Sequence, residues 1–314
     1  MVTQTRVELV GCHPKFRKAL DFASNVSVTK SPVLIVGEAG TGKKTISLFI
    51  HENSQRQNSP IYEVDCSQEA QQVENQILGF RDPESGSFNK GVLELANGGT
   101  VIFANIEGLD ENFQKRLYQI IQELPDYELD IRLLATTSKN LSKYVGAGRF
   151  YRALYTYFSG SQIMITPLRE RTNDIEVLSN YFAKAFGNNT SKIIDGFSPE
   201  AMTKLTSYYW THNVAELRAV VEGATEAAAT SVISIQDIQL GERKSESIVN
   251  DMDENGLKLM SLKEAEKLLI KKALIHTSEN RTQAAKILGV SIRTLRNKIN
   301  EYRGNGTNYF VNLR

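Results

Sequence analysis

A glycine-rich stretch at residues 37–44 constrains the fold more than any other part of this 314-residue chain. Its sequence, GEAGTGKK, fits the pattern G-x-x-x-x-G-K, follows the apolar run VLIV and precedes a helical pattern. In that context the backbone N–H groups can surround phosphate oxygens, and the lysine can reach the terminal phosphates. The pattern predicts a phosphate-binding loop between a buried strand and a helix, although a glycine-rich turn without a ligand remains the simpler alternative.

The loop and the start of the following helix form the candidate nucleotide-binding site. Its residues are Gly37, Glu38, Ala39, Gly40, Thr41, Gly42, Lys43, Lys44 and Thr45. The place after Lys43 normally carries a hydroxyl that binds magnesium, but here it is Lys44, and Thr45 comes one place too late. We therefore expect that ATP or ADP can bind, whereas magnesium lacks one of its usual ligands.

Apolar runs and helical patterns alternate along the first half of the chain. Four runs are expected to be buried strands, at 33–36, 101–103, 131–135 and 163–165. Helical patterns lie between them, as at 45–52 and 111–123. This alternation predicts an α/β domain at residues 1–166, with a parallel sheet and helices on both of its faces.

The rest of the chain has no strand pattern. Residues 167–240 predict a helical lid subdomain, with helices expected at 173–186 and 198–209. A polar stretch at 241–256 is expected to be a linker. It precedes an all-α domain at 257–303, and a tail follows at 304–314.

The charge of the chain is unevenly distributed. The net charge is +1, yet residues 257–303 hold 11 Lys and Arg against 4 Glu, and the remaining residues together carry −6. Such a basic segment favours a nucleic-acid partner. No apolar stretch approaches the length that crosses a membrane, and Cys12 and Cys66 lack the spacing of a metal site. We expect a cytoplasmic protein with no membrane partner and no structural metal.

Residues 280–302 predict a helix-turn-helix that binds double-stranded DNA. Ala284, Ala285, Ile287 and Leu288 are expected to pack the first helix, Gly289 permits the turn, and Ser291 caps the second helix. The expected DNA-binding residues are Arg281, Lys286, Ser291, Arg293, Thr294, Arg296, Asn297 and Lys298. Arg293, Thr294 and Asn297 are placed for base edges. The residues placed for phosphates are Arg281, Lys286, Arg296 and Lys298. A solvated basic helix pair is the alternative.

Several short motifs occur in the order and at the spacing of one family. They are GEAGTGK at 37–43, DCS at 65–67, GGT at 98–100, IRLLATT at 131–137, GRF at 148–150, PLRER at 167–171, Trp210, NV and EL around Ala215, and NRTQAA at 280–285. The chain thereby resembles, from about Val10 to Tyr302, the AAA+ ATPase domain of bacterial sigma-54-dependent transcription activators with their Fis-type helix-turn-helix. We expect no separate sensory domain before Val10, so that any signal reaches the body directly.

The resemblance also shows what this chain lacks. An aspartate that holds magnesium and a glutamate that polarises water are expected after Gly-Gly-Thr, and here they are Ala104 and Asn105. Two arginines that complete a neighbouring subunit's site are Tyr151 and Tyr157, and the arginine of the lid that senses nucleotide is Ala215.

An asparagine expected after Ala-Thr-Thr is Ser138, and Glu107 is no natural substitute, because in a regular strand it would lie about 6.6 Å from Asn105. We therefore expect no catalytic residues and no ATPase activity. The sigma-contacting loop of the family corresponds to residues 80–90, for which an ordinary polar surface loop is favoured. Tyr208, Tyr209 and Trp210 are expected in the core of the lid.

The leading hypothesis is a non-enzymatic, sequence-specific transcriptional regulator. Its AAA+ domain would bind nucleotide without hydrolysis and serve for oligomerisation or ligand sensing, as a dimer or a larger homo-oligomer. Two alternatives stay open: an active ATP-dependent activator of sigma-54 RNA polymerase, and a non-catalytic partner subunit that modulates an intact, related activator.

Overall fold

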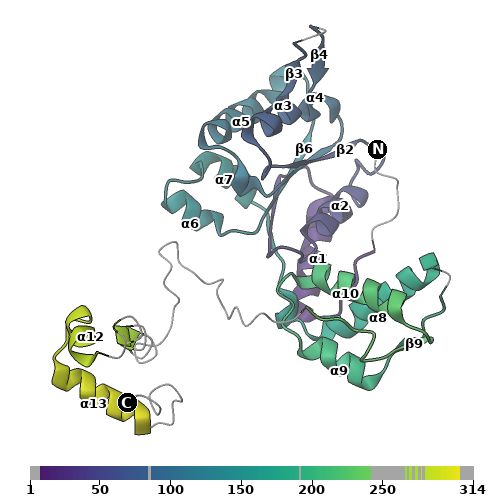
Figure 1. Ribbon diagram of the computed structural model, residues 1–314. Coiled ribbons are helices and arrows are strands. Elements are labelled where there is room, and N and C mark those ends of the chain that lie inside the picture. Colours follow the sequence, from purple (N-terminus) through teal and green to yellow (C-terminus); the bar gives the residue numbers. More distant parts are fainter. Residues whose placement is uncertain are drawn as a thin grey trace. The chain divides into compact units, whose positions relative to one another are not determined.

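The computed structural model describes residues 8–83, 86–190, 192–241 and 280–304, together with residues 266, 269–270, 273–274 and 277. The chain divides into two compact units, Met1–Leu240 and Gly241–Arg314, which are described separately (Figure 1). Nearly all of the expected linker and tail lies outside the described residues.

A five-stranded parallel sheet forms the centre of the first unit. Its strands are β1 (Val33–Val36), β2 (Ile61–Asp65), β5 (Thr100–Ala104), β6 (Arg132–Thr137) and β7 (Gln162–Met164). The order is β2-β5-β6-β1-β7, and every neighbouring pair is parallel. The predicted α/β fold is confirmed. The sequence did not predict β2, whose pattern IYEVD mixes acidic and apolar residues at the edge of the sheet.

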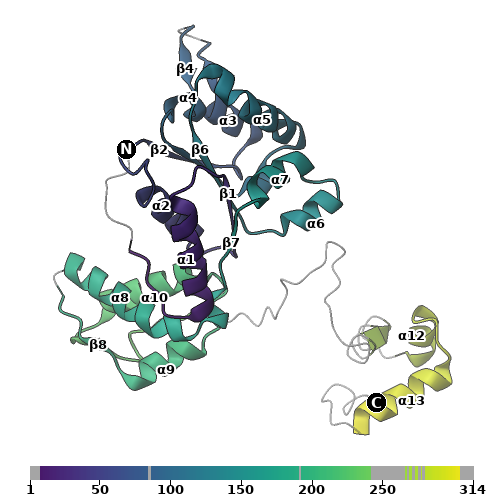
Figure 2. The same cartoon turned by 180° about the vertical axis from the view of Figure 1, so that it is seen from behind.

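Helices cover both faces of the sheet (Figures 1 and 2). Because neighbouring residues of a strand face opposite sides, Ile35 packs in the core beneath α1 (Pro14–Ser27) and α2 (Lys43–Glu52). Leu34 packs in the core on the other face. That face is covered by α3 (Ala70–Leu78), α4 (Val92–Leu95), α5 (Glu111–Glu123) and α7 (Arg152–Ser159).

Shorter elements complete the α/β subdomain. They are α6 (Leu141–Gly146) and the single 3-10 turns η1 (Ile106–Gly108), η2 (Leu124–Tyr127) and η3 (Leu168–Glu170). The segment at 80–90, expected to be a polar loop, instead contains an antiparallel hairpin of β3 (Gly79–Arg81) and β4 (Phe88–Lys90). Phe80 and Phe88 are exposed on this hairpin.

The lid subdomain consists of α8 (Asn173–Thr190), α9 (Pro199–Ser207) and α10 (Asn213–Ala227), together with a pair of two-residue parallel strands. These strands, β8 (Gly196–Phe197) and β9 (Val232–Ile233), were not predicted. Trp210 is fully buried in the lid core and Tyr208 packs against it, as expected. The prediction for Tyr209 was wrong: its side chain is exposed, and the Arg169 guanidinium lies 5.2 Å from its ring centroid.

The second unit contains α12 (Arg281–Ile287) and α13 (Ile292–Gly304). Ala284 and Ala285 of α12 pack against Leu295, Ile299 and Tyr302 of α13. The prediction that Ile287 packs in this core was wrong, because its side chain is exposed. Ile287 lies outside the arc of the helix that Ala284, Ala285 and Leu288 share, which explains its exposure.

Candidate nucleotide-binding pocket and helix-turn-helix

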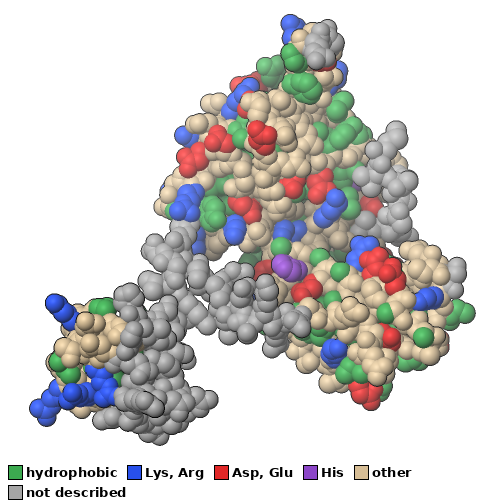
Figure 3. Space-filling view, viewed as in Figure 1, with side chains coloured by type: hydrophobic (Ala, Val, Ile, Leu, Met, Phe, Trp, Pro, Cys, Tyr) green, Lys and Arg blue, Asp and Glu red, His purple; other side chains and the backbone are tan. Residues whose placement is uncertain are grey.

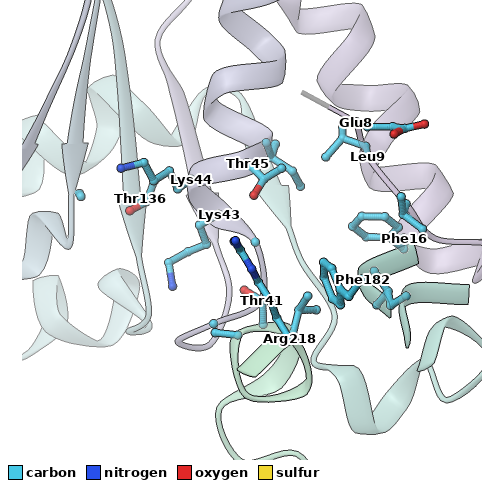
Figure 4. Close-up of a pocket in the computed structure, with 18 of the residues that line it drawn as sticks. Glu8, Leu9, Phe16, Thr41, Lys43, Lys44, Thr45, Thr136, Phe182 and Arg218 are labelled. Atoms are coloured by element: carbon cyan, nitrogen blue, oxygen red, sulfur yellow. The ribbon is translucent and has the colours of Figure 1, made fainter. Parts of the chain in front are cut away.

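A pocket of about 470 Å³ lies between the glycine-rich loop, the segment before α1 and the lid (Figure 4). The pocket has two chemically different ends. Lys43, Lys44 and Thr136 lie at one end, and Leu9, Phe16 and Phe182 lie at the other. This arrangement suits a ligand that joins an anionic group to an apolar ring.

The glycine-rich loop has the backbone geometry that a phosphate-binding loop requires. Gly40 and Gly42 have φ values of +75° and +101°, which favour glycine, and α2 begins immediately afterwards at Lys43. The Lys43 ammonium donates to the carbonyl oxygens of Gly37 and Glu38, at 2.7 and 3.0 Å. Burial lowers the pKa of Lys43, while the charges of Glu107 and Glu38 oppose that shift.

The nine residues predicted to bind nucleotide are not equally placed. Six of them, Gly40 through Thr45, line the pocket, and Gly37, Glu38 and Ala39 do not. Instead, the Glu38 carboxylate accepts two hydrogen bonds from Arg169, both at 2.6 Å. These bonds lower the pKa of Glu38 despite its partial burial. Glu38 therefore ties the loop to the start of the lid subdomain.

The start of α10 contacts the loop directly through Asn213. Its amide donates to the carbonyl oxygen of Ala39 at 2.9 Å and to Glu38 Oε2 at 3.2 Å. Its own oxygen accepts the N–H of Leu168 at 2.8 Å. Asn213 is fully buried and has a φ of +54°, a conformation that asparagine tolerates better than most residues.

Two further contacts hold the loop against the lid. The Ala215 N–H donates to the carbonyl oxygen of Gly40 at 3.1 Å. The backbones also approach closely here, since a Cβ at Gly40 would lie 2.0 Å from the carbonyl oxygen of His212. The buried Arg171 donates to the carbonyl oxygen of Thr41 at 3.2 Å and lies 3.5 Å from Asp174. The loop and the lid are therefore bonded at several points.

The residues expected at the positions of the family's magnesium ligand and water-polarising glutamate, Ala104 and Asn105, lie at the end of β5. β5 ends at Ala104, and Asn105 adopts a φ of +53°, so the chain turns into η1 instead of extending. The amide of Asn105 donates to Asp65 Oδ1 at 3.0 Å. Desolvation opposes the charge of Asp65, but hydrogen bonds from Asn105 and Ser67 outweigh it and lower the pKa.

Glu107 lies on the 3-10 turn η1, so the distance of about 6.6 Å expected in a regular strand does not apply to it. Its Oε1 accepts from the N–H and the hydroxyl of Ser138, at 3.1 and 3.0 Å. Its Oε2 is buried without a hydrogen-bond partner among the described residues. No group of three or more His, Cys, Asp and Glu side chains suited to a metal occurs in the part of the chain that the structure describes.

Tyr151 and Tyr157, which are expected at the positions of the family's two arginines, pack against the protein core. Tyr151 lies in edge contact with Tyr118 at 5.8 Å between ring centroids, and Tyr157 lies in the same way against Phe158 at 5.1 Å. Arg152, the neighbour of Tyr151, is exposed.

Sequence reasoning missed Arg218, which lines the pocket from the lid (Figure 4). Arg218 follows Ala215 by three residues on α10, and so the two share one side of the helix. The helical spacing could have revealed Arg218 as a cation on the same side of α10 as Ala215, where the sensor arginine was expected.

The candidate DNA-binding residues lie on the two helices of the second unit. Asn280 caps α12 by accepting from the N–H groups of Thr282 and Gln283, at 3.1 and 3.2 Å. Ser291 accepts the N–H of Thr294 at 3.0 Å at the start of α13, and Gly289 has a φ of +65° in the turn. The two helices and their tight turn thus have the local geometry of a helix-turn-helix.

The side chains of Lys286, Arg293, Arg296 and Asn297 are exposed, and Figure 3 shows Lys and Arg side chains projecting from this unit. Ser291 and Thr294 are also exposed, with their hydroxyls 2.7 Å apart. Lys298 is less available, because its ammonium lies 3.0 Å from Glu266 Oε2, and Arg281 is half-buried.

Comparison with known proteins adds three family matches. The sigma-54 interaction domain matches residues 9–164, the AAA+ ATPase lid domain matches 169–254, and the Fis family of bacterial regulatory proteins matches 261–302. The described residues contain no helix with the length and hydropathy needed to cross a bilayer.

Individual relatives agree with these matches. The chain is 32% identical to the transcriptional regulatory protein ZraR of Klebsiella oxytoca, with 93% of this chain and 68% of the relative covered. It is 31% identical to the regulatory protein AtoC of Escherichia coli, with 89% and 64% covered. The crystal structure of NtrX from Brucella abortus with ADP has the same fold, with a TM-score of 0.67 at 20% identity, covering 95% of this chain and 70% of that one.

Proposed function

Because the chain belongs to the sigma-54 activator family, we propose that it is a DNA-binding transcriptional regulator whose AAA+ domain binds a nucleotide without hydrolysing it. We place it in the bacterial cytoplasm, where its DNA target lies. The observation that carries the nucleotide proposal is the pocket that Lys43 lines from the loop and Arg218 lines from the lid.

Nucleotide binding is supported by the shape and chemistry of this pocket. Lys43 and the N-terminus of α2 suit phosphates, and the apolar end at Leu9, Phe16 and Phe182 suits a base. NtrX from Brucella abortus has been solved with ADP and with ATP. We expect calorimetry on the full chain to detect ADP and ATP, and Lys43→Ala to weaken both by about tenfold or more.

The absence of hydrolysis is supported by how the nearby carboxylates are engaged. Position 105 carries an amide, Asp65 accepts from that amide, and Glu107 accepts from Ser138 through one of its two oxygens. Tyr151 and Tyr157 stand where arginines would stabilise phosphoryl charge, a contribution of about 10³–10⁵ in rate. ATP turnover on a seconds timescale that disappears in Lys43→Ala would contradict this part of the proposal.

Slow hydrolysis is the second candidate. The observation that favours it is that, against the effect of desolvation, hydrogen bonds hold the pKa of Asp65 below its usual value, which leaves a charged carboxylate at the end of β2. The Asp65 carboxylate accepts from the amide of Asn105 at 3.0 Å, just beyond the end of the neighbouring strand β5. If Asp65 polarises water, Asp65→Asn will remove the slow activity while ADP still binds. Equal background rates in the original protein and in Asp65→Asn would exclude this candidate.

DNA binding is supported by the Fis family match and by the exposed cations of α12 and α13. We propose that the protein binds as a dimer or larger homo-oligomer, since one small module makes few base contacts. A regulator of this family would act with RNA polymerase or alongside a related activator. The full chain should retard a DNA library at low salt, and Arg293→Ala combined with Arg296→Ala should abolish the shift.

A further inference from the structure

The residues around Lys44 do not fit the magnesium ion that the family's chemistry implies. A P-loop usually offers the metal a hydroxyl at this position, and a carboxylate completes the site at the end of the strand. Here the two positions are Lys44 and Ala104, and both line the pocket. Neither side chain supplies an oxygen ligand, and an ammonium group repels a divalent cation.

Lys44 is oriented along the wall of the pocket by an ion pair. Its ammonium lies 2.5 Å from Glu63 Oε2, on β2. Glu63 also lines the pocket, and the Lys44 side chain keeps 66% of its exposure. The pair therefore fixes the position of the Lys44 ammonium at the phosphate end, while the side chain stays accessible to a ligand.

The charged residues that line the pocket favour a polyanion, because the cations outnumber the acidic residues. Lys43, Lys44 and Arg218 line it as cations, while Glu8 and Glu63 are its acidic residues. Arg171 also lines the pocket, but it is committed to Thr41 and Asp174. Lys43 and Lys44 are adjacent at the N-terminus of α2, where the helix dipole adds positive potential.

We propose that this pocket takes a nucleoside diphosphate or triphosphate in its metal-free form, with the Lys44 ammonium in the role that magnesium plays elsewhere. The inference rests on the proposed nucleotide binding and specifies the ligand. A magnesium–nucleotide complex has less negative charge and would bring a second cation towards Lys44. Magnesium therefore competes with the protein for the phosphates instead of assisting binding.

The test is calorimetry of the full chain with ADP and with ATP, once in EDTA and once in excess MgCl₂. We expect binding in EDTA and weaker binding with magnesium. Lys44→Thr should lose about tenfold in affinity in EDTA, the value of one charge-assisted contact. Lys44→Thr combined with Ala104→Asp should bind more tightly when magnesium is present. Lys115→Thr, an exposed residue of α5 that does not line the pocket, is the matched control.

The outcomes separate this inference from the proposed function. Binding that requires magnesium, or that magnesium strengthens about tenfold, overturns the inference and leaves nucleotide binding intact. Unchanged affinity of a folded Lys44→Thr variant in EDTA also overturns it. If neither nucleotide binds under either condition, both proposals are wrong. Circular dichroism of each variant verifies that the fold is retained.

Discussion

The side chain of Asn213 makes three of the hydrogen bonds at the junction between the glycine-rich loop and the lid. It donates to Glu38 and Ala39, accepts from Leu168, and is fully buried in a left-handed conformation. A substitution there leaves several polar groups unsatisfied and places a less tolerant residue at positive φ.

We expect Asn213→Ala to lower the free energy of unfolding of the first unit by about 2–4 kcal/mol. Urea unfolding followed by the fluorescence of Trp210, the single tryptophan, measures this directly. Asn112→Ala on the exposed side of α5 is the control and should change little. An equal effect of the two substitutions would show that the Asn213 contacts contribute nothing.

Glu38 gives the same junction a dependence on pH. Its hydrogen bonds with Arg169 hold its pKa below the ordinary value of 4.5. The stabilisation is therefore fully present above pH 4.5 and is lost as the pH falls through the lower, folded-state pKa. Glu38→Gln should lower the urea midpoint at pH 7 and should match the original protein more closely as the pH decreases below 4.5. A constant difference at all pH values would contradict this assignment.

At the scale of the element, α13 depends on its first turn. Ser291 accepts the N–H of Thr294, which satisfies one of the backbone groups left free at a helix start. We expect Ser291→Ala to cost about 1 kcal/mol in local stability, which would speed amide hydrogen exchange in α13 about fivefold. Gln283→Ala, an exposed position on α12, should leave that exchange unchanged.

The elements that the sequence predicted are those with a strong local pattern. The apolar run at 33–36 and the glycines that follow it predict a buried strand and a loop because both signals are local. β2 was not predicted, because most of its side chains are only half-buried at the edge of the sheet and give no continuous apolar run. The turn of the chain at Asn105, with its positive φ, ends β5 early and moves Glu107 to a place that strand spacing does not describe.

The contacts of Glu38 with Arg169 and Asn213 could not be predicted from the sequence, for a different reason. Arg169 is 131 residues away along the chain and Asn213 is 175 residues away. No local pattern relates such positions, and so Glu38 was grouped with the loop residues expected to face the ligand. The packing of the lid places Glu38 at a structural junction instead.

At the scale of the whole molecule, the near-neutral charge conceals a strong asymmetry. Residues 257–303 carry a net charge of +7 and the remainder carries −6. DNA binding should therefore weaken steeply as salt increases. Replacing a phosphate-contacting cation such as Arg296 with alanine should reduce the slope of log K against log salt by about 1 for every DNA sequence.

Arg293→Ala should behave differently if this residue contacts a base. We expect a loss of about 1–3 kcal/mol on the preferred sequence and a smaller loss on other sequences. Fluorescence anisotropy at several salt concentrations measures both effects. Uniform losses for Arg293→Ala across all sequences would assign it to the phosphates.

The two cysteines of the chain differ sharply in accessibility. Cys66 is buried in the sheet core, whereas Cys12 is exposed. The backbone N–H of Cys12 donates to Asp174, and Asp174 lies beside Arg171, which reaches the loop at Thr41. Desolvation and the contact with Asp174 raise the pKa of Cys12, so a thiol reagent calls for mildly alkaline buffer. The unaltered chain therefore accepts a single fluorophore at Cys12, and this label reports optically on changes at the junction between the glycine-rich loop and the lid.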